Sequence, residues 1–452
     1  MVAHSHDEEN ALGGHAGRVI VLGAGLAGLS AAYRLKHHHG HDEVIVIEKN
    51  SHVGGTASTV TVDGYSFDLT GHALHLGDSM VERFITEDLE MKDELVKVRR
   101  KAGILIEDRI VPYPFQYNLG HLTRGLRDKC VIDFLEATYS EGRRSRDSTE
   151  QCVSPSFLDY SYSAFGRSIT EVFMRPYNRK LWCIDPDDLS TDWMDLVLPK
   201  PDLQEILRGA FTVKDHDDTG YNAEFYYPRE GGIQHLSEGI GKKIKSLIRL
   251  GKEVTDIDMD RKLVKCRDEE YHYDYLVSTI PLKDFMRIAR IPCKKGRLSN
   301  TITRGFIVVV PSSKAPKYSW IYIPDETKRL YRIGNFSMFS PNISKPGMDV
   351  LWLECAVLSD ECEELPLFDD ILEEMRDCAW LPIEHLKHLA TIDIDPSYVV
   401  FDRMRNMTLE PVIEECRRKD VIPCGRYGLW SYMSMEQAIK SGFDAADYCM
   451  QQ

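Results

Sequence analysis

The most constraining feature of this sequence is a glycine-rich run close to its start. Four apolar residues, Val19–Leu22, precede Gly23, Gly25 and Gly28 in the spacing G-x-G-x-x-G, and a helical apolar pattern follows over Leu29–Leu35. The apolar residues predict a buried parallel strand. The glycines suit a tight turn, a close approach of the backbone to a pyrophosphate, and close packing of a helix on that strand. The run therefore predicts a dinucleotide-binding turn.

A second strand and an acidic residue extend this unit. Val44–Ile47 is again apolar and ends at Glu48, whose carboxylate can accept both hydroxyls of an adenosine ribose. Gly54, Gly55 and Thr56 follow, an extension typical of flavoproteins in which FAD lies along the motif. No second G-x-G-x-x-G follows, so the predicted cofactor is FAD rather than a nicotinamide dinucleotide. The alternative is a glycine-rich turn in some other α/β protein.

Length and composition narrow the class of protein. A chain of 452 residues with 43% hydrophobic residues is long enough for two or three subdomains around one cofactor. Its net charge of -15 argues against a nucleic-acid partner, because phosphates require a basic face. No apolar run approaches the roughly 20 residues of a membrane-spanning helix. We expect no membrane association.

The N-terminal residues and the cysteines predict a cytoplasmic protein. Residues 1–17 have neither the basic region nor the apolar core of a signal peptide and are expected to form a disordered tail. The eleven cysteines show no C-x-x-C pair, which indicates reduced thiols rather than disulfides or zinc. The histidines at 37, 38, 39 and 41 are expected in a solvated loop rather than in a metal site, and no metal is predicted.

Two segments before residue 185 carry candidate site residues. A hairpin that turns at Asp63–Gly64 leads into His72. His72 has two interpretations, a buried histidine satisfied by the backbone or a residue beside the isoalloxazine, where flavin charge would shift its pKa. Further on, a helical segment is expected to break at Pro176. Arg175 lies in that apolar, aromatic segment, where a charge needs a partner.

The rest of the chain reads as strands, turns and a last helix. Mixed helix and a polar loop over residues 141–151 are expected between residues 119 and 159. A β-meander and a returning strand over residues 254–281 complete a flavin-binding domain. An alternating, aromatic-rich antiparallel sheet follows over residues 306–357. The last helix, residues 434–450, starts after a glycine turn, and its N-terminus would stabilise negative charge on a reduced flavin.

Seven motifs in order resemble one family, the UDP-galactopyranose mutases, especially their eukaryotic-type members. They are VPYPFQ at 111–116, FMRPYN with K-x-W at 173–182, NAEFYYP at 222–228, LVSTIP at 276–281, W-x-Y-x-P at 320–324, YRIGNFSMFSP at 331–341 and GRYGLWSY at 425–432. The resemblance covers residues 18 to about 445. These motifs are more specific than the glycine motif alone.

The resemblance implies a ring contraction of a nucleotide sugar without net redox change, with UDP-galactopyranose to UDP-galactofuranose as the expected reaction. In this family reduced FAD attacks the anomeric carbon through its N5 and forms a flavin–sugar adduct, while the diphosphate leaves and later returns. FAD would be active when reduced, with NAD(P)H as the expected reductant. Arginines suit the diphosphate because a guanidinium makes paired, charge-assisted hydrogen bonds to phosphate oxygens.

The resemblance also assigns residues. The catalytic candidates are His72, Arg175 and Arg332. The substrate-binding candidates are Tyr113, Gln116, Arg175, Asn222, Tyr322, Arg332, Tyr398 and Tyr432, with Tyr113 and Gln116 beside the uridine. The cofactor-binding candidates are Gly23, Gly25, Leu26, Ala27, Gly28, Glu48, Lys49, Gly54, Gly55, Thr56, His72, Val254, Gly425, Arg426, Met435, Glu436 and Gln437.

Three departures from the family's pattern bear on the site. The family's Gly-Gly-His is Thr70-Gly71-His72 here, and a Tyr-Pro motif is replaced by Tyr398-Val399. The last helix starts with Met433-Ser-Met-Glu-Gln437 where the family usually has asparagine or aspartate. These changes leave the identity of the sugar and of the nucleotide open.

The expected fold is α/β: an FAD-binding Rossmann-type, glutathione-reductase-like domain with a helical subdomain and an antiparallel-sheet substrate domain. The expected boundaries are 18–100, 228–285 and 386–452 for the FAD-binding domain, 119–205 for the helical subdomain, and 101–118, 206–227 and 286–385 for the sheet domain. The alternative function is an FAD-dependent oxidase or desaturase of the amine oxidase and protoporphyrinogen oxidase group; a third is a non-catalytic FAD-binding protein. A homo-oligomer is compatible with the sequence.

Overall fold

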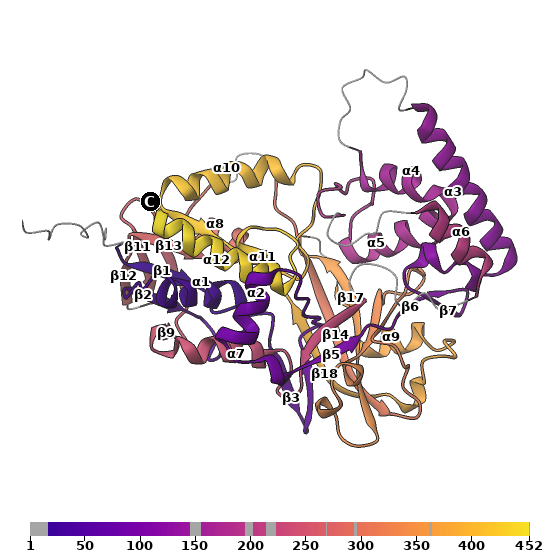
Figure 1. Cartoon of the computed structure of the whole chain (residues 1–452), viewed down its shortest axis with the longest axis horizontal. Helices are drawn as coiled ribbons and strands as arrows, with labels where there is room; N and C mark the ends of the chain where they lie inside the picture. The colour runs from indigo at the N-terminus through magenta and orange to yellow at the C-terminus, as the bar shows by residue number, and fades with distance from the viewer. Residues whose placement is uncertain are drawn as a thin grey trace, which may run out of the picture.

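A five-stranded parallel sheet and a seven-stranded, mostly antiparallel sheet organise the chain (Figure 1). The computed structural model describes residues 17–144, 155–194, 202–213, 223–267, 269–292, 296–360 and 364–451. The expected tail, apart from Gly17, lies outside these residues. So do Asn222 and most of the expected 141–151 loop.

The parallel sheet has the strand order β19-β13-β1-β2-β9. Its central strand β1 is buried along its whole length, as the unbroken apolar run Val19–Leu22 predicts for a strand covered on both faces. Its strands are β1 (Val19–Leu22), β2 (Val44–Ile47), β9 (Ile248–Arg249), β13 (Tyr275–Ser278) and β19 (Val421–Pro423). Three further strands form the predicted meander: β10 (Asp256–Asp258), β11 (Leu263–Cys266) and β12 (Glu269–His272).

Helices cover this sheet. In Figure 1, α12 (Met435–Gln451), the last helix of the chain, runs beside α1 (Leu26–His37), the first. The two helices approach closely at Gly442, where a Cβ would lie only 2.2 Å from the carbonyl oxygen of Ala27. The other helices of this region are α2 (Ser79–Arg83), α7 (Gln234–Lys243), α8 (Leu282–Ile288), α10 (Arg405–Arg418) and α11 (Gly425–Gly428).

The seven-stranded sheet has the order β18-β14-β17-β16-β15-β6-β7. The strands are β6 (Ala102–Ile106), β7 (Arg109–Pro112), β14 (Thr301–Pro311), β15 (Trp320–Tyr322), β16 (Arg332–Asn335), β17 (Met348–Leu358) and β18 (Lys387–Ile394), and α9 (Phe368–Glu374) lies between β17 and β18 in the chain. The register pairs Arg332 with Tyr322 on one side and with Glu354 on the other. Residues paired in this way share one face of a sheet, so these three side chains are neighbours.

Two two-stranded sheets complete the described strands. β3 (Thr59–Val62) and β4 (Tyr65–Asp68) turn at Asp63 and Gly64, both with positive φ (51° and 75°), as the Asp-Gly pair predicts. β5 (Leu95–Arg99) pairs antiparallel with β8 (Glu224–Pro228). The chain segment after β4 brings Gly71 against the seven-stranded sheet, since a Cβ there would lie 2.5 Å from the ring of Trp352 in β17, and Leu74 bridges to Tyr226 of β8.

A helical region lies beside the seven-stranded sheet (Figure 1). It contains α3 (Arg124–Arg144), α4 (Phe157–Ile169), the π-helical turn η5 (Thr170–Met174), α5 (Arg175–Trp182) and α6 (Leu203–Phe211). The break predicted at Pro176 is milder than expected, because Pro176 lies in the first turn of α5, where a missing N–H is tolerated, directly after the π turn. The non-helical residue of this run is Gly166, with φ 76°, where a Cβ would lie 2.5 Å from the backbone of Asp133 in α3.

Strand pairing shifts three of the expected boundaries. β18 pairs with β14, so residues 387–394 belong to the seven-stranded sheet rather than to the FAD-binding domain. β8 pairs with β5 rather than with the seven-stranded sheet, and α6 packs against α3 of the helical region. The common cause is long-range partner choice, which local sequence pattern does not encode. Across the described ranges, no helix is both long and apolar enough to cross a membrane.

Candidate active site

The glycines of the first turn have three different environments. Gly23 has φ +96°, a conformation that favours glycine. At Gly28 a Cβ would lie 2.0 Å from the carbonyl oxygen of Gly23, so packing of α1 on β1 excludes a side chain there. At Gly25 the nearest neighbour of a Cβ would be the carbonyl oxygen of Gly54, at an ordinary 3.9 Å. No close contact with the described protein requires glycine at position 25. Such an open position is expected where glycine allows the backbone to approach a bound pyrophosphate.

The surroundings of Gly25 fit a dinucleotide. Gly25 is the N-cap of α1 and no side chain caps the helix, so its first N–H groups are available to an anion. Gly54 bridges to Gly25 and donates to the carbonyl of Ala24 at 2.9 Å, which brings the second glycine pair beside the first. The carboxylate of Glu48 is buried at the end of β2 and accepts from the backbone N–H groups of Ala24 (2.7 Å) and Asn50 (2.8 Å).

The remaining cofactor candidates are spread around this cradle. Leu26 and Ala27 lie buried in the first turn of α1, Lys49 is exposed, and Val254 is half-buried after β9. At the start of α12, Glu436 accepts from the N–H groups of Gly77 and Asp78, and Gln437 and Ser434 exchange hydrogen bonds. The carboxylate of Glu436 and the amide oxygen of Gln437 therefore already accept hydrogen bonds from the protein backbone. Met435, the first residue of this helix, is half-buried.

Arg426 lies at the centre of an aromatic group. Its guanidinium carbon is 4.8 Å from the ring centroid of Tyr432 and 5.1 Å from that of Tyr398, and these two rings stack 6.0 Å apart. Tyr427 also flanks it and hydrogen-bonds with Thr56. The guanidinium donates to the carbonyl of Ser397 at 3.2 Å. Cation–π contacts of this kind stabilise a buried cation that lacks a carboxylate partner.

His72 is buried and neutral. Burial lowers its pKa to about 4, and the nearby cations Arg426 and Arg332 act in the same direction. Its Nδ1 has no hydrogen-bond partner among the described residues and lies 3.9 Å from a carboxylate oxygen of Asp68. Asp68 itself accepts from Thr59, Tyr227 and the N–H of Ile233, and burial raises its pKa to about 7. An imidazole with an unpartnered nitrogen is suited to meet a ligand atom.

Arg332 is held in place by a carboxylate and a hydroxyl. Its Nε donates to Glu354 at 2.5 Å and one Nη donates to Thr70 at 3.2 Å, while Thr70 donates to the other oxygen of Glu354. The side chains of Arg332 and Glu354 are 14% and 2% exposed, so the guanidinium is fixed in a nearly dry environment. These contacts use two of its five N–H donors.

Tyrosines surround this guanidinium. The ring of Tyr322 lies 5.7 Å from Tyr113 and 5.0 Å from Tyr177 of α5. The guanidinium of Arg100 is 4.8 Å from the ring of Tyr113. Tyr432 is near enough to Arg332, Arg426 and Tyr322 for their charges to influence it, and burial raises its pKa to about 12. We call Tyr113, Tyr322, Tyr398, Tyr432, Arg332 and Arg426 the tyrosine–arginine cluster.

Two substrate candidates lie outside these contacts. Arg175, at the start of α5, pairs with Glu171 at 3.4 Å, and both side chains are more than a third exposed. Phe173 and Tyr177 of the same helix stack on each other toward Tyr322, which leaves Arg175 on another side of the helix. Gln116 is buried in the turn η3 (Phe115–Tyr117), and its Nε2 has no partner among the described residues.

Sequence inspection missed Arg100, Thr70, Glu354 and Tyr177. One signal was available for Glu354, which is a lone charge inside the apolar strand LWLECAVL and therefore requires a buried partner. Arg100 gave no signal, since it sits in the basic run Arg99–Lys101, a pattern typical of an exposed surface.

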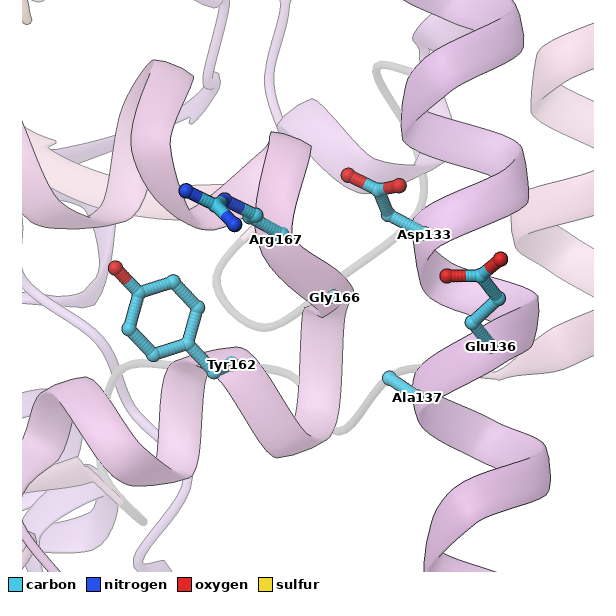
Figure 2. A pocket seen from close by; sticks show the side chains of 6 residues that line it. All are labelled: Asp133, Glu136, Ala137, Tyr162, Gly166 and Arg167. Atoms are coloured by element: carbon cyan, nitrogen blue, oxygen red, sulfur yellow. The ribbon is translucent and has the colours of Figure 1, made fainter.

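A separate cavity of about 560 Å³ opens in the helical region, between α3 and α4. Figure 2 shows Tyr162, Gly166 and Arg167 on one side, and Asp133, Glu136 and Ala137 on the other. None of the predicted site residues lines it. Within the described ranges, no group of three or more histidine, cysteine or acidic side chains is placed to hold a metal ion. None of the eight cysteines in these ranges forms a disulfide.

Comparison with known proteins identifies the class. The family model of the flavin containing amine oxidoreductases matches residues 26–295. Coproporphyrinogen III oxidase of Staphylococcus aureus (strain NCTC 8325 / PS 47) is 24% identical over 296 residues, 59% of this chain and 61% of that protein. The 4,4'-diaponeurosporene oxygenase of Staphylococcus haemolyticus (strain JCSC1435) is 37% identical over 76 residues, 17% of this chain and 15% of that one. The chain thus spans less than two thirds of the length of these relatives.

Solved structures match over nearly the whole chain. The crystal structure of reduced UDP-galactopyranose mutase has a TM-score of 0.82 and 25% identity, and covers 96% of this chain and 95% of that one. A putative protoporphyrinogen oxidase from Exiguobacterium sp. 255-15 has a TM-score of 0.70 and 15% identity, with coverage of 96% and 98%.

The fold, the open position at Gly25 and these matches define an FAD-dependent flavoenzyme, so the predicted fold class and the predicted cofactor are confirmed. The chain belongs to the family of flavin containing amine oxidoreductases.

Proposed function

We propose that this flavoenzyme is a mutase that interconverts the pyranose and furanose forms of a nucleotide sugar, with UDP-galactose as the expected substrate. The observation that carries the proposal is the tyrosine–arginine cluster, in which Glu354 fixes the guanidinium of Arg332, Tyr322 is its neighbour across the strands, and Arg426 lies against the rings of Tyr398 and Tyr432. The likeness to the reduced UDP-galactopyranose mutase over 96% of the chain supports it.

The cluster suits a diphosphate that leaves a sugar and must stay in the site. Arg332 still has N–H donors beyond those given to Glu354 and Thr70, and a guanidinium pairs well with phosphate oxygens. Tyr432 is protonated at neutral pH, as any tyrosine with an ordinary pKa near 10 is, and burial raises its pKa further to about 12, so its hydroxyl can donate to an anion. Hydrogen bonds to a charged group contribute about 1.5–3 kcal/mol each.

The other parts of the chain have supporting roles in this proposal. FAD bound along Gly23–Gly28 supplies, when reduced, the nucleophile for the anomeric carbon. His72 presents a neutral imidazole to the reaction site, and its free Nδ1 can exchange a proton with Asp68 or a ligand. Tyr113 and Gln116 are the proposed contacts of the uridine. The seven-stranded sheet then forms the substrate domain, and the helical region covers it.

The second candidate function is an oxidase or desaturase. It is favoured by the sequence relatives, which are named oxidases and an oxygenase. The buried charge of the cluster speaks against an apolar substrate, since Arg332, Arg426 and Arg100 would have to be desolvated without gain from the ligand.

A titration with UDP tests the substrate class. Arg332→Ala is expected to weaken UDP binding about tenfold to a hundredfold, since it removes a charged, buried contact, while the FAD absorbance spectrum stays unchanged. Arg175→Ala is the matched comparison, and its effect should be smaller because Arg175 is exposed and paired with Glu171. Equal UDP affinity of Arg332→Ala and the unaltered protein would remove the nucleotide-sugar proposal.

A further inference from the structure

Lys180 is a buried ammonium group outside the tyrosine–arginine cluster. It lies in α5, and its Nζ donates to three main-chain carbonyls, those of Ile323 (2.7 Å), Asp325 (2.9 Å) and Leu330 (2.6 Å). An ammonium has three N–H donors and no acceptor, so three carbonyls satisfy it completely. A neutral amine would turn a lone pair toward one of these oxygens. The geometry therefore selects the protonated form.

The three carbonyls belong to one turn, residues 323–330, which connects β15 to β16. This turn begins directly after Tyr322 and ends two residues before Arg332, and these two residues are paired across the strands. Lys180 thus joins the helical region to the turn whose two ends carry members of the cluster. On the same helix, Tyr177 also contacts the ring of Tyr322.

Burying a charged ammonium group between a helix and a turn costs free energy, because the charge loses its hydration. Burial lowers the pKa of Lys180 to about 7; Asp325, Glu374 and Glu326 oppose this change, and Lys328 reinforces it. The same helix already reaches the same turn through Arg179, which pairs with Glu326 at 3.6 Å with both side chains more than half exposed. Exposed pairs of this kind hold a turn only weakly. Three short bonds to the backbone fix its path.

We propose that Lys180 is a positioning residue for the substrate diphosphate: by holding the 323–330 turn against α5, it fixes Tyr322 and Arg332 in the geometry that grips the phosphates. This inference rests on the proposed function for its ligand, but the anchoring itself does not depend on it. Lys180 acts in this proposal only through the turn, because its Nζ is given entirely to main-chain carbonyls.

The test compares Lys180→Met with Arg179→Met in the full-length, FAD-loaded protein. Methionine keeps the volume of the lysine stem and removes all three donors, whereas Arg179→Met removes only the exposed pair. Amide hydrogen exchange is measured on the peptide covering residues 320–333, and UDP affinity by titration of the flavin absorbance. We expect Lys180→Met to speed exchange and to weaken UDP binding, each about tenfold or more, with its FAD spectrum retained. Arg179→Met should behave like the unaltered protein.

Two results would overturn the inference. Unchanged exchange in residues 320–333 of Lys180→Met would show that the ammonium does not hold the turn. Faster exchange with unchanged UDP affinity would show that the turn does not position the site. If the unaltered protein itself fails to bind UDP, the proposed function falls, and the exchange comparison still decides whether Lys180 is an anchor. Should Lys180→Met not fold, Lys180→Gln, which keeps two donors, takes its place.

A pH series separates positioning from mere support of the fold. The charged groups around Lys180 are Asp325, Glu326 and Lys328 of the turn, Glu374 of α9 and Arg179 of α5 itself. As the pH rises from about 6 to about 9, the unaltered protein should lose the proton of Lys180. The ratio of the UDP dissociation constants of Lys180→Met and the unaltered protein should then fall toward one. A ratio that stays at one over the whole range would contradict a role for the protonated amine.

Discussion

At the scale of the residue, the glycines of the first turn are required for different reasons. Gly28 is required by the protein, since a side chain there would meet the carbonyl of Gly23 at 2.0 Å. Gly25 is assigned to the ligand as a prediction, since a Cβ there would lie no closer than 3.9 Å to a protein atom. The two positions therefore separate binding of FAD from stability of the fold.

This difference predicts opposite phenotypes for two substitutions. Gly25→Val should abolish FAD retention and lower the free energy of unfolding of the FAD-free protein by no more than about 1 kcal/mol, since valine is a poorer N-cap than glycine. Gly28→Ala should lower that free energy by about 1–3 kcal/mol through overpacking. Flavin absorbance after purification and urea unfolding of the FAD-free proteins measure the two effects. A Gly25→Val protein with its full complement of FAD would contradict the assignment of this cradle.

His72 predicts a pH dependence of stability. Its pKa is about 4 in the folded protein, because of burial and then of Arg426 and Arg332, and about 6.5 when unfolded. Between these values the unfolded chain binds a proton that the folded chain does not, so stability rises with pH from about 4 to 6.5 and is lost as the pH falls through this window. His72→Asn should reduce this loss, by at most about 3 kcal/mol. Urea unfolding at pH 4.5 and 7 tests it, and identical slopes for both proteins would show that His72 does not lose its proton on folding.

The sequence predicts the conformation of a residue well where only its neighbours in the chain determine that conformation. The positive φ at Gly23 and the acid at the end of β2 follow from the motif itself. The surroundings of Arg100 and the pairing of Arg332 with Glu354 depend on which strands become neighbours. Arg332 and Glu354 are 22 residues apart in the sequence, so a local pattern does not reveal their contact. The role of Arg175 stays a prediction. Its motif resembles that of a substrate arginine, and its described partner is Glu171, one helical turn away.

At the scale of the element, the contact between α1 and α12 ties the two ends of the chain together. Gly442 of α12 lies against the carbonyl of Ala27, in the first turn of α1, at a distance that leaves no room for a Cβ. The N-terminus of α1 faces the predicted pyrophosphate position. The packing of the last helix therefore sets the geometry of the cradle.

A substitution in this contact should affect both stability and FAD. Gly442→Val is expected to lower the free energy of unfolding by about 1–3 kcal/mol and to reduce FAD content, because α1 must move away from α12. The control is Gly125→Ala in α3, where a Cβ would meet nothing within 4 Å and stability should not fall. Thermal unfolding and flavin absorbance measure the outcome. Full stability of Gly442→Val would mean that the two helices do not pack as described.

Elements with strong periodicity were predicted correctly, and irregular ones were not. The strands of the first unit and the last helix lie within a residue or two of their predicted bounds, because apolar runs and glycines mark them clearly. The run around Pro176 was less regular than predicted at Gly166 and more regular at the proline. The π turn and the close contact between two helices result from tertiary packing, and a local sequence pattern does not predict such packing.

At the scale of the whole molecule, the FAD-binding fold is specified by one short motif and the substrate region is not. The fold class followed from the first strand–turn–helix unit, and the comparisons confirm it. The assignment of β18 and β8 to sheets did not follow, since strand partners far apart in sequence decide it. The same long-range pairing assembles the tyrosine–arginine cluster, on which the proposed chemistry depends.

Product analysis with UDP-galactose and dithionite-reduced enzyme tests the central proposal most directly. We expect chromatography to reveal a second UDP-sugar of unchanged mass, formed over many turnovers without net consumption of reductant, and Arg332→Ala to suppress it strongly. An unchanged UDP-galactose peak, together with peroxide release when an amine or porphyrinogen substrate is oxidised in air, would contradict the mutase and establish the oxidase instead.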